Sequence, residues 1–183
     1  RRTRQETMLM DTYTGQQFDP MQMQEENICI EDIAHALSLM CRGGGHIRTF
    51  YSVAQHSLNC TKEAKAQGYS KRVQLACLLH DASEAYIADI IRPVKAHLSN
   101  YLKIEDQIMA CIWKQFDLAD LSLEEQKAWK KMDDLLLEQE LKHLMPGEEN
   151  RFIPVLASIP DLRQRNWQDV EQEFIQCFKD LHV

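Results

Sequence analysis

The chain has 183 residues and a mass of 21.4 kDa, a length typical of a single domain. Its formal net charge of −7 argues against non-specific binding to nucleic acid or to a membrane surface, because both are negatively charged. Hydrophobic residues make up 44% of the chain, whereas glycine and proline number only 6 and 5, which favours a helical globular fold. No apolar stretch reaches membrane-spanning length and no signal-peptide pattern opens the chain, so we expect a cytoplasmic protein.

The six cysteines show no close-pair spacing, and several lie in apolar helical runs. We therefore expect buried thiols in a reducing cytoplasm rather than disulfides or zinc ligands. The positions are Cys29, Cys41, Cys60, Cys77, Cys111 and Cys177.

Residues 1–29 show no steady period, and we expect them to form an arm packed on a domain of residues 30–183. Apolar residues at helical spacing predict a first helix over about residues 31–41. Three glycines follow at 43–45, where a simple turn, a helix stop and a close approach of backbone to a ligand are all open readings. Arg42, His46 and Arg48 surround them and form the local positive patch that an anionic substrate would need.

Further helices are predicted downstream from capping signals and apolar periodicity. A broad apolar face marks the third of them as a central helix, which continues past Tyr86 until Pro93 interrupts it. No strand signal stands out, so the sequence predicts an all-α bundle of about six main helices. The later helices are expected at about 53–67, from residue 70 to about 90, 97–116, 122–145 and 167–181.

A histidine and an aspartate, His80 and Asp81, stand side by side at the end of the apolar run at 75–79. Buried ionisable groups are costly unless they are paired or hold a metal. On a continuous helix Glu84 would share their face, and a nitrogen donor with carboxylates suits a divalent cation. A hydrogen-bonded core pair is the alternative for His80 and Asp81, and an exposed helix residue is the alternative for Glu84.

Two other predicted helices offer ligands of the same kind, His56 and Asp133. Seen alone, His56 is an ordinary capped or surface histidine, and the neighbouring Asp134 is an alternative to Asp133. The order of histidine, histidine–aspartate and aspartate resembles the metal site of the HD-domain phosphohydrolase superfamily. In that all-α family, two histidines and two aspartates from different helices hold a divalent metal.

The resemblance covers about residues 30 to 145 and includes the segment Tyr-Ser-Val-Ala-Gln-His-Ser at 51–57. The segment His-Asp-Ala-Ser-Glu at 80–84, with Asp89 and the Pro-Val-Lys at 93–95, is similar to the bacterial 5′-deoxynucleotidase branch. Asp133, followed by Glu140, is similar to that branch's last ligand segment. One departure is Gly43, since the branch has an aromatic residue at that place which helps exclude ribose.

The resemblance implies a role for each matching residue. His56, His80, Asp81 and Asp133 would bind the metal, and Glu84 would be the acid/base residue. Asp89 would contact the substrate or order the nucleophile. Arg42 would bind phosphate, helped by Arg48 and Lys95, although ordinary surface charge is an alternative for all three.

The expected function is release of phosphate from (deoxy)nucleoside 5′-monophosphates by a metal-activated water. The divalent ion would be Co²⁺, Mn²⁺, Fe²⁺, Ni²⁺, Zn²⁺ or Mg²⁺. A dNTP triphosphohydrolase with the same metal site and a nucleotide-binding regulatory module are the rival functions, and Glu84 argues against the module. We expect a nucleotide substrate, no nucleic-acid or membrane partner, and a homo-oligomer of two or more subunits.

Overall fold

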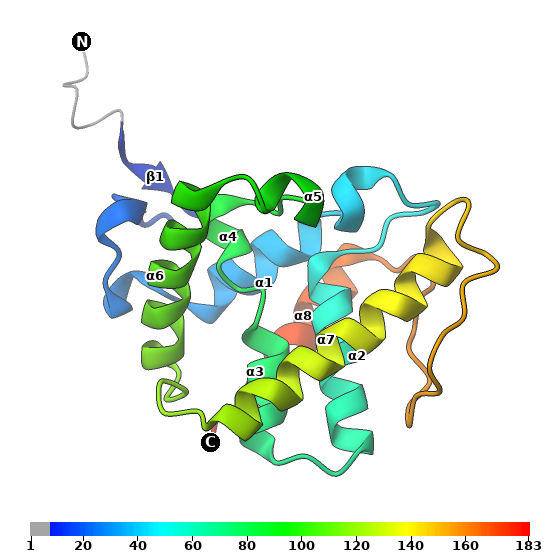
Figure 1. Cartoon of the computed structure of the whole chain (residues 1–183). Coiled ribbons are helices and arrows are strands. Elements are labelled where there is room, and N and C mark those ends of the chain that lie inside the picture. Colours follow the sequence, from blue (N-terminus) through cyan, green and yellow to red (C-terminus); the bar gives the residue numbers. More distant parts are fainter. Residues whose placement is uncertain (1–7) are drawn as a thin grey trace.

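A computed structural model describes residues 8–183, and it is an all-α protein as predicted (Figure 1). Within these residues, six helices have nine or more residues each, and two have four. No helix of this part of the chain is long and apolar enough to cross a membrane. The helices are α1 (Ile30–Leu39), α2 (Val53–Ala66), α3 (Lys71–Leu79), α4 (Glu84–Ile87), α5 (Arg92–Lys95), α6 (Ser99–Gln115), α7 (Leu123–Leu144) and α8 (Trp167–Leu181).

Four of the six longer helices begin at a side chain that accepts a hydrogen bond from the first turn. Ser52, Ser70, Ser122 and Asn166 each cap the helix that follows. At Ser122 the capping box is complete, because the Glu125 side chain also accepts from the Ser122 backbone. These caps satisfy otherwise unpaired N–H groups, which is why the sequence marked the starts of these helices well.

Helix α2 occupies the centre of the bundle and is buried along most of its length. Figure 1 shows α7 crossing obliquely over α2 and α3, with α8 behind them. A large apolar core joins α1, α2, α3, α6 and α8, and a smaller one lies where α7 meets α2 and α3. Polar side chains that point from α2, α3 and α7 toward this crossing are therefore held away from bulk water.

The prediction that the third helix continues past Tyr86 is wrong, because α3 ends at Leu79 and a turn precedes α4. The Nδ1 atom of His80 lies 2.6 Å from the Cys77 carbonyl oxygen, which in a continuous helix would accept from the Asp81 backbone. Turn hydrogen bonds take over instead, from Ala82 to Leu79 and from Glu84 to Asp81. The His80 side chain thus competes with the Asp81 backbone N–H for the Cys77 carbonyl oxygen, and Asp81 lies in a turn rather than in α3.

The N-terminal segment contains a short antiparallel pair, β1 (Met10–Asp11) and β2 (Gln17–Phe18), which the sequence did not predict. Two 3₁₀ helices follow, η2 (Pro20–Gln22) and η3 (Glu25–Asn27). The Thr14 backbone and hydroxyl both donate to Asp32 of α1, and Phe18 is buried in the main core. The first seven residues of the predicted arm lie outside the described part of the chain, and the boundary at residue 30 stays a prediction.

The long connection between α7 and α8 is fixed to α2 by one buried carboxylate, Glu63. Its oxygens accept hydrogen bonds from the backbone N–H groups of Ala157 and Ser158, at 2.7 and 2.9 Å, and from the Ser158 hydroxyl at 2.6 Å. Gln55 and Asn59 of α2 donate to backbone carbonyls further along the same connection. The connection therefore has a defined path although it has no regular structure.

Candidate metal centre

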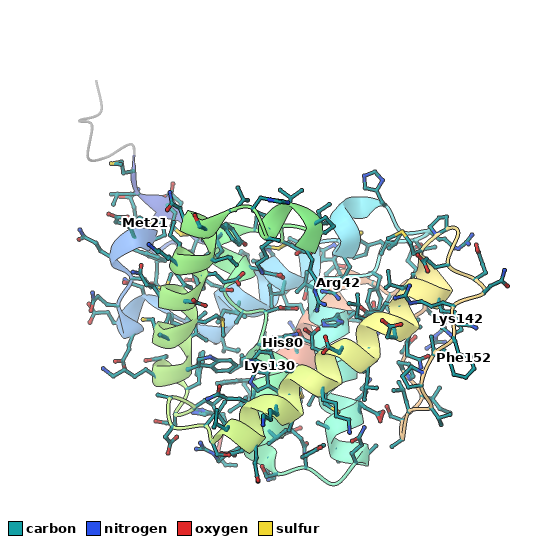
Figure 2. All side chains as sticks on the ribbon, viewed as in Figure 1. Met21, Arg42, His80, Lys130, Lys142 and Phe152 are labelled. Atoms are coloured by element: carbon teal, nitrogen blue, oxygen red, sulfur yellow. The ribbon has the colours of Figure 1, made fainter. Side chains whose placement is uncertain are left out.

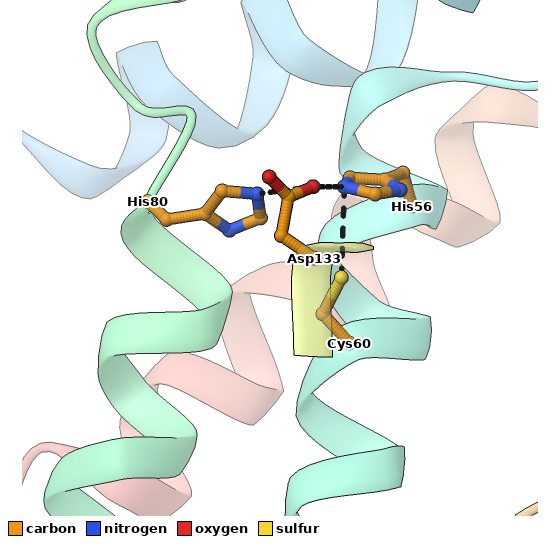
Figure 3. Close-up of side chains that lie close together, drawn as sticks. All are labelled: His56, Cys60, His80 and Asp133. Atoms are coloured by element: carbon orange, nitrogen blue, oxygen red, sulfur yellow. Dashed lines mark hydrogen bonds and ion pairs between the residues drawn. The ribbon is translucent and has the colours of Figure 1, made fainter. Parts of the chain in front are cut away.

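Four side chains, from α2, from α7 and from the residue that follows α3, meet where α7 crosses α2 and α3. Each of His56, Cys60, His80 and Asp133 offers a ligand atom, and these atoms all lie within 4.8 Å of one another. Figure 3 shows the Asp133 carboxylate between the two imidazole rings, with Cys60 below His56. Asp133 Oδ1 lies 2.9 Å from His56 Nε2 and 3.4 Å from His80 Nε2. The cluster lies close enough together to bind a metal ion.

Asp81 lies at the edge of the same cluster. Its Oδ2 atom is 3.2 Å from His80 Nε2 and 3.8 Å from His56 Nε2. The structure thus brings together the four residues expected to bind metal. Asp134 does not join them, because 68% of its side chain is exposed and it faces Arg92 at 3.6 Å.

Both histidines are oriented by an acceptor on the far side of the ring. His56 Nδ1 lies 2.5 Å from Glu140 Oε2, and that oxygen also accepts from the Tyr51 hydroxyl at 2.6 Å. His80 Nδ1 is held by the Cys77 carbonyl. Histidines that bind metal commonly use their second nitrogen in this way, which fixes the ring and leaves Nε2 free for the ion.

Several buried polar atoms in this cluster make no well-directed hydrogen bond among the described residues, although His80 Nε2 and Asp81 Oδ2 face each other at 3.2 Å. They include His80 Nε2, Asp81 Oδ2 and Glu84 Oε2. Unpaired buried polar atoms are costly and call for an explanation. A divalent cation between the histidines and aspartates would satisfy the first two, so the residues present fit such an ion.

The charges in the metal-free cluster are strongly coupled. Burial disfavours the charged ring of His80, but Asp81 and Asp133 outweigh it and raise the pKa of His80 well above its usual value. Burial likewise opposes ionisation of Asp81, but the neighbouring His80 dominates and lowers its pKa to about 2. The pKa of Asp133 is lowered for the same reason, against its own burial. Protons on the histidines therefore balance the carboxylates where a cation could do so instead.

Glu84 lies buried next to this cluster, at the start of α4. Burial, followed by the negative charges of Asp81 and Asp89, raises its pKa well above the usual glutamate value. Asp89 follows Ala88, whose φ of 68° lies in a region that L-residues rarely adopt. Glu84 therefore lies beside the cluster, and Asp89 lies near Glu84.

The predicted substrate-binding residues occupy three different settings. Arg42, in 3₁₀ helix η4 (Arg42–Gly45), donates to Glu140 at 2.9 Å and faces Asp81 at 3.7 Å (Figure 2 shows it above the cluster). Arg48 pairs with Glu149, and Lys95 pairs with Glu105 at 2.6 Å. Arg42 therefore borders the cluster, whereas the roles of Arg48 and Lys95 in substrate binding stay predictions.

Sequence reasoning missed three residues of the site. Cys60 is the buried free thiol that the sequence predicts, and its Sγ atom lies among the candidate ligand atoms of the cluster. Glu140 was noted only as part of a motif, and Arg92, 3.4 Å from Asp133 Oδ2, was not singled out. The spacing of Cys60 four residues after His56 was a signal available in the sequence.

The fold and the cluster define an all-α protein with a candidate metal centre buried between three helices. No protein-family model matches the chain. The chain is 34% identical over 149 residues to the uncharacterized protein YfdR of Escherichia coli K12, a match that covers 81% of this chain and 79% of YfdR. It is also 38% identical over 111 residues to an uncharacterized protein of Rhodobacter capsulatus, covering 57% of this chain and 56% of that protein. The chain belongs to the same family as YfdR.

Proposed function

We propose that the protein is a metal-dependent phosphohydrolase of the HD-domain superfamily that releases phosphate from (deoxy)nucleoside 5′-monophosphates. The observation that carries the proposal is the convergence of His56, His80, Asp81 and Asp133, with a buried Glu84 beside them. Glu84 has a buried oxygen without a hydrogen-bond partner among the described residues, which is costly in a purely structural core.

The metal would be held by the two Nε2 atoms and the two aspartates. A divalent ion bound there would activate water near neutral pH and offset charge on the phosphoryl oxygens. The chain contributes the orientation of these ligands, because Glu140 and the Cys77 carbonyl hold the two imidazole rings. It also excludes bulk water, since His56 is fully buried and Trp129 packs against His80 with ring centroids 5.5 Å apart.

Glu84 is proposed to move the proton in this reaction. Burial and the charges of Asp81 and Asp89 raise its pKa, which favours the protonated form of the carboxyl group. It can donate that proton to the leaving oxygen of the ester, a role that typically contributes about 10²–10⁴-fold in rate. A binding-only module would gain nothing from a proton donor at this position, which favours an enzyme.

Arginines at the edge of the cluster would bind the phosphate group of the substrate. The protein carries a net charge of −7, so an anionic substrate needs local positive charge. Arg92 supplies it, because its guanidinium lies 3.4 Å from Asp133 Oδ2 while 64% of the side chain remains exposed. Arg42 is less exposed, at 17%, and its contacts with Glu140 and Asp81 also make it a brace for the ligands.

The settings of the remaining cations favour a monophosphate over a triphosphate substrate. A triphosphate would need additional positive groups beyond the first phosphate. Arg48 and Lys95, which are expected to help Arg42 bind phosphate, are already paired with Glu149 and Glu105. The dNTP triphosphohydrolase therefore remains the second candidate.

The test is product analysis with a panel of dNMPs, NMPs and dNTPs in the presence of Co²⁺, Mn²⁺ or Mg²⁺. We expect orthophosphate and nucleoside from the monophosphates. The NMP arm also reports on sugar choice at Gly43, whose backbone φ is 64° and where an added Cβ atom would meet the side chains of Ile47 and Met145. Triphosphate released from dNTPs would instead identify the second candidate.

A further inference from the structure

Cys60 has a position that the proposed reaction does not explain. It lies on α2 one helical turn after His56 and is fully buried. Its Sγ atom is 3.5 Å from His56 Nε2 and within 4.8 Å of the ligand atoms of His80 and Asp133. Figure 3 shows the thiol directed at the side of His56 that also faces Asp133. The sulfur thus points at the place where both imidazole Nε2 atoms converge.

Burial in a core does not by itself account for this direction. Cys77 is an equally buried cysteine in the same small core between α2, α3 and α7. Its sulfur is not among the clustered ligand atoms, although its backbone carbonyl holds His80. The two cysteines therefore differ in where the sulfur points rather than in how deeply it is buried.

We propose that Cys60 is a ligand of the metal, bound through its thiolate beside His56, His80 and the two aspartates. The inference depends on the metal centre of the proposed function but not on the reaction or its substrate. On binding, the S–H proton leaves to solvent and a bond forms between Sγ and the ion, with no change in oxidation state.

The distances agree with one shared ion. Neighbouring ligand atoms bound at about 2.0–2.3 Å to the same ion lie roughly 2.8–3.8 Å apart, in octahedral or tetrahedral arrangement. The separations from His56 Nε2 are 3.5 Å to Cys60 Sγ, 2.9 Å to Asp133 and 3.8 Å to Asp81. Measured from His56 Nε2, the sulfur is therefore placed as well as the carboxylates to reach a shared ion.

A thiolate would change which metals the site prefers. Thiolate sulfur is a soft ligand that favours Zn²⁺, Co²⁺ and Fe²⁺, whereas Mg²⁺ and Ca²⁺ prefer oxygen. With only histidine and aspartate ligands the site would accept a wider range of divalent ions. The proposal thus assigns this protein a borderline-soft metal, with Cys60 as the residue that selects it.

The test is titration of the metal-free full-length protein with Co²⁺, followed by near-ultraviolet absorption and calorimetry. A sulfur-to-cobalt charge-transfer band is expected in the wild type and in Cys77→Ser, the matched control. Cys60→Ser should lose the band and bind Co²⁺ at least about tenfold more weakly, a loss of the size seen when metal-ligand shells are altered. X-ray absorption of the zinc-loaded wild type should show one sulfur neighbour at about 2.3 Å, which needs no variant.

The outcomes separate this inference from the proposed function. Stoichiometric Co²⁺ binding with no charge-transfer band and no sulfur neighbour would overturn the role of Cys60 and leave the metal centre standing. Such a result would mean that Cys60 is a core thiol that only contacts His56. Failure to bind any of these metals would overturn both proposals together.

Discussion

The carboxylate of Glu140 lies 2.5 Å from Nδ1 of His56, on the side of the ring opposite the candidate metal centre. Glu140 stands two turns after Asp133 on α7, and Asp133 faces Nε2 of the same ring. Helix α7 therefore contacts both ring nitrogens of His56, Nδ1 through Glu140 and Nε2 through Asp133. Glu140 also accepts from Tyr51 and Arg42, so α7 is linked both to His56 and to the segment that precedes α2.

Replacing Glu140 by glutamine should weaken metal binding without unfolding the protein. The amide has the same shape but removes the charge that makes His56 a better ligand, and loss of such a partner typically costs about 10–100-fold in metal affinity. Calorimetric titration with Co²⁺ measures this, with Glu138→Gln as the control because Glu138 pairs with Arg151 instead. Equal affinity in wild type and Glu140→Gln would show that this contact does not orient a metal ligand.

The adjacent aspartates of α7 should differ sharply in their effect on metal binding. Asp133→Asn should abolish it, since Asp133 lies between both histidines. Asp134→Asn should leave it unchanged, because that side chain is exposed and faces Arg92 rather than the cluster. Equilibrium dialysis with Zn²⁺ or Co²⁺ gives the comparison directly. If Asp134→Asn were the variant that lost the metal, the assignment of the cluster would be wrong.

Glu84→Gln should retain metal and nucleotide but lose turnover by about 10²–10⁴-fold, the usual contribution of a positioned acid or base. The substitution keeps the shape of a buried side chain and removes only its ability to give up a proton. The loss should therefore appear in kcat with little change in KM. Hydrolysis at the wild-type rate would remove Glu84 from the reaction.

The metal-free and metal-loaded proteins should respond to pH in opposite directions above about pH 6.5. The pKa of His80 is raised in the folded state, so its stabilising contribution is complete below the unfolded value of about 6.5 and is lost as pH rises through the folded value. Asp81 has a lowered pKa of about 2, so its contribution is lost only as pH falls below the usual aspartate range.

Metal binding reverses the alkaline trend, because the ion needs the deprotonated rings and binds more tightly as pH rises. Thermal unfolding at several pH values from about 6 to about 8.5, with and without saturating Co²⁺, would show the two slopes. Parallel slopes would mean that the histidine protons and the metal do not compete.

Glu63→Ala should destabilise the protein although it is remote from the reaction. Hydrogen bonds to a charged group contribute about 1.5–3 kcal/mol each, and this carboxylate accepts several from residues 157 and 158, so we expect a loss of at least about 2 kcal/mol. Urea unfolding measures it, and Lys65→Ala, at an exposed position of α2, is the matched control. Equal midpoints for the two variants would contradict the anchoring role of Glu63.

Much of the fold was predictable because local signals decided it. Ser52, Ser122 and Asn166 mark the helix starts that the structure confirms, since capping depends only on neighbouring residues. The end of α3 was not predictable from propensity. There the His80 side chain takes the Cys77 carbonyl from the helix, and a polar side chain competing for the backbone leaves no periodic signal.

The sequence likewise identified some residues of the candidate metal centre and not others. His56, His80, Asp81 and Asp133 were identified by residue type and order, and the fold brings them together. Cys60 was set aside because cysteine spacing was compared only with other cysteines, whereas its relevant neighbour is His56 one turn earlier. The place of Arg92 beside Asp133 depends on how α5 lies against α7, which sequence periodicity does not encode.

The most direct test of the central claim is release of orthophosphate from a dNMP by the metal-loaded wild type, measured beside Glu84→Gln carrying the same metal. We predict phosphate and nucleoside in equal amounts from the wild type, and at least about a hundredfold less from the variant. Metal-loaded wild type that binds nucleotides yet releases no phosphate from any of them would contradict the account.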